Sequence, residues 1–141
     1  MTITKAYKVR LYPTKTQQEL MIKTFGCTRF VYNKALHICQ ETYRTSKRPV
    51  FYGELSRMLT FWKTMTELSF LKAVDKFALQ NSLRDLCQGF TNMKHGAGYP
   101  KYKSKHDHHD SYKTQFTNIN IAVDNTYIIL PKLGHIRYRD K

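Results

Sequence analysis

The sequence predicts an α+β protein in which a long helical segment interrupts a small β-barrel or sheet. Residues 5–12 alternate between apolar and polar side chains, as in a half-buried strand. Residues 14–93 then carry helix signals, and strand-like segments return after residue 111. Because so few strands need a partner sheet, the first strand is expected to join the last ones.

The helical segment is expected to begin at Thr14. Pro13 ends the first strand, and Thr14 stands three residues before Gln17, which is the spacing of a capping box. The helix is predicted to run to about residue 45, bent or divided in two at Gly26. Its expected core residues are Leu20, Phe25, Val31, Ala35, Ile38 and Cys39.

Two more helices are predicted, over residues 52–65 and 74–93. The second has a narrow apolar stripe with i, i+4, i+7, i+11 spacing, formed by Leu79, Leu83, Leu86 and Phe90. Beside this stripe, or away from the core, lie Lys76, Phe77, Gln80, Asn81 and Arg84. An amide, cations and a ring on one surface can contact bases, although an ordinary solvated helix face shows the same pattern.

The last third of the sequence predicts a loop followed by short strands. Residues 94–111 are rich in Gly, Lys and His, which is typical of a loop. Strands are expected over residues 112–123 and 126–130, joined by a hairpin turn at Asp124-Asn125, and again over residues 135–139. No apolar run approaches the roughly 18–20 residues of a membrane span.

The charge of the chain points to a nucleic-acid partner. The 141 residues include 24 Lys+Arg and 10 Asp+Glu, a net charge of +14 that is spread over the whole chain. Phosphate backbones are the common partner of such a field, because neutralising phosphates releases counterions. The 10 Tyr and 8 Phe supply rings that can stack on bases.

Candidate catalytic and metal-binding groups are sparse. His106, His108, His109 and Asp110 lack the spacing of a known zinc site, and His37 with Cys39 has no third partner for nucleophilic catalysis. Three cysteines without a CxxC pair fit a reducing cytoplasm. Phosphate-loop, GxSxG and HExxH motifs are missing, as is a set of convergent carboxylates for a two-metal nuclease. We therefore expect a binding protein that is not an enzyme and needs no cofactor or metal.

Residues 5–36 resemble the start of TnpB, the RNA-guided nuclease encoded by OrfB-type insertion sequences. The family pattern R-L-Y-P-T/N-x-x-Q is present from Arg10 to Gln17, and G-x-x-R-F-V-Y-N from Gly26 to Asn33. Residues 74–86 are similar to the central helix of the family, and residues 99–105, 111–118 and 130–137 to the segment that follows it. The resemblance covers the whole chain in order.

This resemblance implies a wedge domain, which is an incomplete OB-like β-barrel, interrupted by a helical recognition domain. The divisions are 1–13 for the first wedge strand, 14–95 for the helical insert (a helix-turn-helix candidate) and 96–141 for the loop and returning strands. Family members bind guide (omega) RNA and read a short target-adjacent motif on duplex DNA. The matching motif-reading positions are Tyr52, Lys76, Phe77, Gln80, Asn81 and Thr117. Nucleic-acid backbone contacts are expected at Lys8, Arg10, Arg29, Lys34 and Arg84, with an ion pair as the alternative role of Arg29.

Full-length relatives in this family continue with a RuvC-like nuclease domain and a zinc ribbon. The sequence stops before them, so we expect an N-terminal piece without nuclease activity, in a prokaryotic cytoplasm and associated with the nucleoid. Two alternatives remain: a helix-turn-helix regulator that acts on DNA without RNA, and a non-specific RNA-binding protein of the ribosomal kind.

Overall fold

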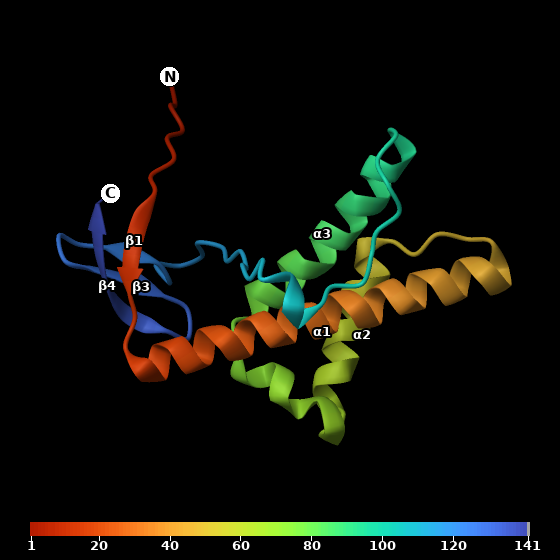
Figure 1. Cartoon of the computed structure of the whole chain (residues 1–141), viewed down its shortest axis with the longest axis horizontal. Coiled ribbons are helices and arrows are strands. Elements are labelled where there is room, and N and C mark those ends of the chain that lie inside the picture. Colours follow the sequence, from red (N-terminus) through yellow and green to blue (C-terminus); the bar gives the residue numbers. More distant parts are fainter. Residues whose placement is uncertain (141) are drawn as a thin grey trace. The chain divides into compact units, whose positions relative to one another are not determined.

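The computed structural model describes residues 1–140, with Asp140 described through its backbone alone. Lys141, the end of the predicted returning segment, lies outside the described residues. The elements in chain order are β1 (Val9–Tyr12), α1 (Lys15–Ser46), α2 (Tyr52–Thr64), the 3-10 helix η1 (Thr66–Ala73), α3 (Lys76–Lys94), the 3-10 helix η2 (Lys105–Asp107), β2 (Ala122–Val123), β3 (Tyr127–Leu130) and β4 (Gly134–Asp140) (Figure 1). The predicted α+β class is confirmed.

The chain divides into two compact units. Met1–Met21 and Gln115–Lys141 form one, here called the sheet unit, and Ile22–Thr114 form the other, the helical unit. The first turns of α1 belong to the sheet unit, and the rest of α1 belongs to the helical unit.

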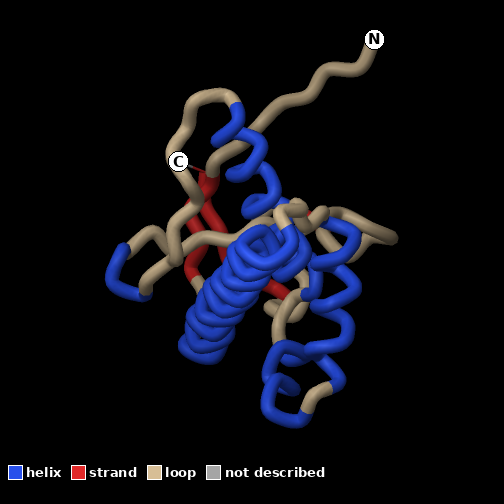
Figure 2. The backbone as a smooth tube through the Cα atoms, turned by 90° about the vertical axis from the view of Figure 1, so that its right-hand side faces the viewer, coloured by secondary structure: helices blue, strands red, loops and turns tan. Residues whose placement is uncertain are grey.

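The sheet unit contains one open antiparallel sheet with strand order β1-β4-β3-β2, drawn in red in Figure 2. β1 pairs with β4, which confirms that the first strand joins the last ones. The predicted hairpin turn is also confirmed: Asp124 Oδ1 accepts the backbone N–H groups of Thr126 and Tyr127 at 2.7 and 2.6 Å. These two bonds hold the pKa of Asp124 below its usual value.

The predicted strand over residues 112–123 is wrong except at its end. Only Ala122–Val123 pairs, because the backbone turns before it, with positive φ values of 44° at Asn118 and 56° at Ile119. The Asn120 side chain stabilises this turn by accepting the N–H of Thr117 at 2.7 Å. The first strand is likewise shorter than predicted, since β4 pairs only from Val9 to Tyr12, and residues 5–8 form no regular structure.

Helix α1 begins with the predicted capping box. Gln17 N donates to Thr14 Oγ1 at 3.3 Å, and Thr14 N donates to Gln17 Oε1 at 2.9 Å. The helix does not divide at Gly26 but continues for 32 residues. A glycine within a helix costs only about 1 kcal/mol relative to alanine. The fully buried Val31 and Leu36 in the next turns favour continuation of the helix.

The core of the helical unit is formed by apolar residues of α1, α2 and α3. The predicted α3 stripe is confirmed at Leu79, Leu83 and Leu86, which are completely buried. Phe90 is only half-buried, and its ring packs edge-to-face with that of Tyr99 at a centroid distance of 5.6 Å. In α1 the predicted core is confirmed at Val31, Ala35 and Cys39, whereas three residues are only half-buried: Leu20, Phe25 and Ile38. No helix within residues 1–140 is both long and apolar enough to cross a membrane.

Candidate nucleic-acid interface

One side of α3 brings most of the predicted motif-reading residues together. The Lys76 ammonium lies 5.2 Å from the centre of the Phe77 ring. The Arg84 guanidinium lies 4.8 Å from the centre of the ring of Tyr52, which is the first residue of α2. The contact with Arg84 therefore brings Tyr52 of α2 next to the predicted residues of α3. The spacing of residues along α3 could not predict this contact. We call this surface the α3 face; its residues are Tyr52, Lys76, Phe77, Gln80, Asn81 and Arg84.

The two side-chain amides on the α3 face, those of Asn81 and Gln80, differ in their hydrogen bonding. Asn81 Nδ2 donates to the carbonyl of Lys113 at 3.0 Å, and Asn81 Oδ1 accepts from Arg84 Nη1 at 3.2 Å. Asn81 therefore helps to hold residues 99–114 against α3. The side-chain amide of Gln80 forms no hydrogen bond to any other part of residues 1–140. It thus keeps both a donor and an acceptor for a ligand.

Thr117, the sixth predicted motif-reading residue, belongs to the sheet unit. Its side chain is exposed, and its backbone closes the turn with Asn120. The helical and sheet units each therefore contain part of the predicted set.

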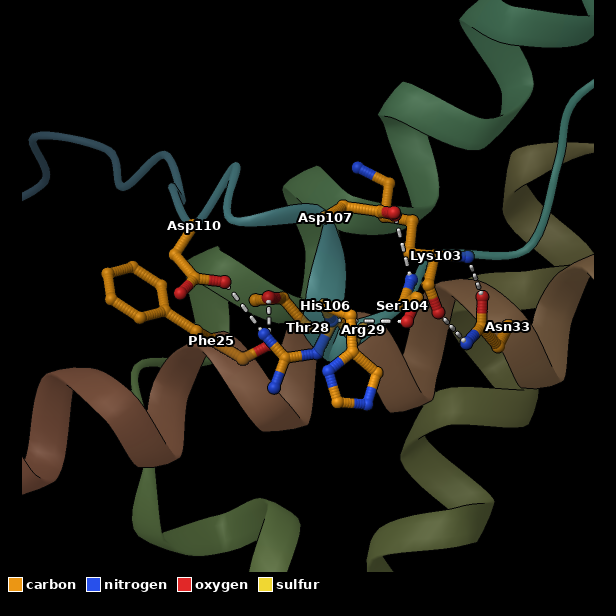
Figure 3. Close-up of polar contacts among 9 residues, drawn as sticks. All are labelled: Phe25, Thr28, Arg29, Asn33, Lys103, Ser104, His106, Asp107 and Asp110. Carbon is orange, nitrogen blue, oxygen red and sulfur yellow. Dashed lines mark hydrogen bonds and ion pairs between the residues drawn. The ribbon is translucent and has the colours of Figure 1, made fainter.

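The predicted backbone contacts fall into two groups. Arg29 is engaged: its Nη1 forms an ion pair with Asp110 Oδ1 at 2.8 Å, and its side chain is 21% exposed (Figure 3). The Lys34 ammonium is placed over the Trp62 ring, 5.3 Å from its centre. The exposed members are Lys8, Arg10 and Arg84, of which Arg84 also contacts Tyr52 and Asn81.

The G-x-x-R-F-V-Y-N segment has a structural role that sequence reasoning missed. Asn33 exchanges two hydrogen bonds with the backbone of Lys103, at 2.9 and 2.8 Å (Figure 3). The Lys103 ammonium lies over the Tyr32 ring at 4.6 Å, and the rings of Phe25 and Tyr112 lie 5.8 Å apart. Together with the Arg29–Asp110 pair, these contacts fasten residues 99–114, which have little regular structure, along α1.

A polar cavity of about 280 Å³ lies between α1 and the His-rich loop. Its wall includes Phe25, Arg29 and Asp110, and Ser104 caps the short helix η2 by accepting the N–H of His106 at 3.1 Å (Figure 3). Within residues 1–140, no three His, Cys, Asp or Glu side chains are grouped as a metal would require. Asp110, one of the candidate ligands, is instead the ion-pair partner of Arg29.

The three thiols are poor nucleophiles in the folded protein. Burial raises the pKa of Cys39 to about 11 and also raises the pKa of Cys27 and of Cys87. We expect iodoacetamide at pH 8 to modify the half-buried Cys87 first and to leave Cys39 unmodified, with all three labelled in urea. Peptide mass spectrometry reads each site separately, and rapid labelling of Cys39 in the native protein would contradict this expectation.

Exposed cations beside half-buried amides and rings on a packed helix, in a strongly basic chain, are typical of a nucleic-acid-binding protein. Residues 1–48 match the family model for OrfB proteins of IS605-type insertion sequences, which is described as "Helix-turn-helix domain". In the structure those residues contain β1 and the single helix α1.

Comparison with curated proteins places the chain in a family. It is 41% identical over 104 residues to the "Putative RNA-guided DNA endonuclease" of Streptomyces pristinaespiralis, covering 73% of this chain and 26% of the relative. It is 33% identical over 137 residues to the "Putative RNA-guided DNA endonuclease InsQ" of Escherichia coli, covering 96% of this chain and 34% of the relative. It is also 32% identical over 114 residues to the "Virulence protein VsdF" of Salmonella dublin, covering 72% of this chain and 94% of that protein.

The chain belongs to the OrfB family of IS605-type insertion-sequence proteins. It spans about a quarter and about a third of the length of the two endonuclease relatives. No nuclease domain is evident in residues 1–140.

Proposed function

We propose that this region reads a short target-adjacent motif in duplex DNA through the α3 face and binds a guide RNA. The observation that carries the proposal is the unengaged amide of Gln80, which lies between Lys76 and Arg84 along one side of the helix. An α-helix fits the major groove, where a glutamine amide pairs with N6 and N7 of adenine. Lysine contacts guanine or phosphate, and an aromatic ring contacts the thymine methyl group.

The RNA partner is supported by charge and by the names of two relatives. Both are named RNA-guided DNA endonucleases, and this chain carries a net charge of +14. In such a system the protein reads a few base pairs and RNA pairing selects the rest of the target. Lys8 and Arg10 then contact nucleic-acid backbone, and Thr117 reads the motif from the returning segment. On this proposal the open sheet is the incomplete OB-like wedge, and the region binds nucleoid DNA in the cytoplasm without cutting it.

The test is a gel-shift selection with duplexes that carry a randomised segment, repeated with transposon-end RNA. Gln80→Ala is expected to reduce discrimination at one base pair by about tenfold or more, because a bidentate amide–adenine contact is lost. Lys76→Ala is expected to weaken binding to all sequences and to lower the salt slope by about 1.

The matched control is Gln88→Ala, two turns away on α3, where the amide already bonds to Asn92 Oδ1 at 2.9 Å. It is expected to leave base selection unchanged. Selection of no motif by the unaltered chain, or the same motif profile after Gln80→Ala, would refute the motif-reading proposal.

A second candidate is a DNA-binding regulator that acts without RNA. The observation that favours it is the helix-turn-helix description of the model matching residues 1–48. Against it, residues 15–46 form one helix without an internal turn. DNA footprinting separates the two: a specific footprint that RNA does not change favours the regulator, and one that requires RNA favours our proposal. Binding that is blind to sequence favours a non-specific RNA-binding protein.

A further inference from the structure

One face of the sheet unit concentrates cations and rings. The strand register places Arg10 opposite Arg139, and places both Tyr12 and Tyr127 opposite Arg137. Residues directly opposite one another in antiparallel strands lie on the same face. This surface, here called the arginine–tyrosine face, consists of exposed residues: Arg10, Tyr12, Tyr127, His135, Arg137 and Arg139.

The pairing of Arg10 with Arg139 is an electrostatic conflict within the chain. Like charges directly opposite each other destabilise a strand pair. Both guanidinium groups lie beside the ring of Tyr12, at 5.7 and 5.8 Å from its centre, and cation–π attraction to this ring opposes the repulsion. Neither arginine forms an ion pair with any carboxylate among the side chains that the structure describes. A phosphate between the two guanidinium groups would remove the conflict and accept charge-assisted hydrogen bonds from both.

The rings on this face suit unpaired bases. Tyr12 is 43% exposed and Tyr127 is 42% exposed, and Tyr127 is held by an edge contact with His135 at 6.2 Å. Aromatic side chains beside a basic track are the arrangement that binds single strands, because each base can stack on a ring. In a duplex the bases are already stacked on each other and cannot reach a sheet surface.

We propose that the arginine–tyrosine face binds single-stranded RNA, with bases stacked on Tyr12 and Tyr127 and a phosphate held between Arg10 and Arg139. The sheet unit has 8 basic and 3 acidic residues, which complements a polyanion. The assignment to RNA rather than DNA rests on the RNA partner of the proposed function. The single-stranded character rests on the exposed rings alone, and the face shares no residue with the α3 face.

The test measures the affinity of the full chain for fluorescent twelve-uridine RNA by anisotropy. Tyr12→Leu is expected to weaken binding about tenfold, because one base loses its stacking platform. Tyr12→Phe, which keeps the ring, is expected to bind within about twofold of the unaltered chain. An abasic RNA of equal length is expected to bind Tyr12→Leu and the unaltered chain alike.

Charge is tested separately with Arg139→Gln. This change is expected to weaken binding of both RNAs and to lower the salt slope by about 0.7, as for one phosphate contact on a single strand. The control is Lys15→Gln, which removes the same charge from the exposed first residue of α1, off the face. It is expected to change affinity by less than about twofold.

Unchanged uridine-RNA affinity in a folded Tyr12→Leu variant would overturn the proposal, as would equal weakening toward the abasic RNA. Equal affinity for twelve-thymidine DNA would overturn the assignment to RNA. A different result would show that the guide-RNA proposal fails. In that case transposon-end RNA binds no tighter than a scrambled RNA, while Tyr12→Leu still weakens binding of the uridine RNA. Motif selection is read in the duplex assay and single-strand binding in the anisotropy assay, so the two proposals are scored independently.

Discussion

Replacing Leu83 with alanine is expected to lower the free energy of unfolding of the helical unit by about 3 kcal/mol. The Leu83 side chain is completely buried, in a stripe with Leu79 and Leu86. Truncation removes apolar contacts and leaves a cavity that the surrounding helices can only partly fill. Urea unfolding followed by tryptophan fluorescence measures this, because Trp62 is the single tryptophan, is 5% exposed and lies in the same unit.

The control for Leu83 is Phe61→Ala on α2. The Phe61 side chain is 65% exposed, so its loss is expected to change the unfolding free energy by less than about 0.5 kcal/mol. If Leu83→Ala cost no more than Phe61→Ala, the core of the helical unit would have to lie elsewhere.

Replacing Gln17 with alanine is expected to destabilise the sheet unit by about 2–3 kcal/mol, roughly 1 kcal/mol for each hydrogen bond lost. Gln17 Oε1 accepts the N–H of Thr14 at 2.9 Å, while Nε2 donates to the carbonyls of Leu133 and His135 at 3.1 and 2.6 Å. One side chain therefore caps α1 and holds the turn that leads into β4. Hydrogen exchange of peptides covering residues 134–139 is expected to become faster, with α3 peptides unchanged.

Gln17→Glu makes this test more specific. The carboxylate keeps an acceptor for Thr14 but faces two carbonyl oxygens without a donor, so we expect at least as large a loss as for alanine. Gln18→Ala, which removes a single bond to the Pro13 carbonyl at 3.2 Å, is the milder control. Wild-type exchange rates in Gln17→Glu would show that the two carbonyl contacts contribute nothing.

Several features of this fold were predictable from the sequence because they depend on neighbours a few residues apart. The Thr14–Gln17 capping box, the Asp124 turn and the buried stripe of α3 are all of this kind. Each is a hydrogen bond or a periodicity within one element, which residue spacing expresses directly. The position of Lys76 and Gln80 on the same side of α3 follows from the same geometry.

Other features were decided by burial and by backbone turns that residue spacing did not predict. The predicted break at Gly26 failed because burial of the residues that follow it in α1 outweighs the low helix propensity of glycine. The strand predicted from residue 112 failed because Asn118 and Ile119 turn the backbone before the sheet begins. The intrinsic helix or strand propensity of a residue contributes less free energy than such tertiary contacts and turns.

The sequence by itself determined that this is a basic α+β protein with a helix able to face DNA, since charge and periodicity are properties of composition and local order. Only the tertiary structure decided which cations are engaged and which are exposed. Arg29 is paired with a carboxylate 81 residues away, whereas Arg10 faces Arg139 across two strands. Pairings of this kind follow from strand register and helix packing, which require the complete fold and leave no local pattern in the sequence.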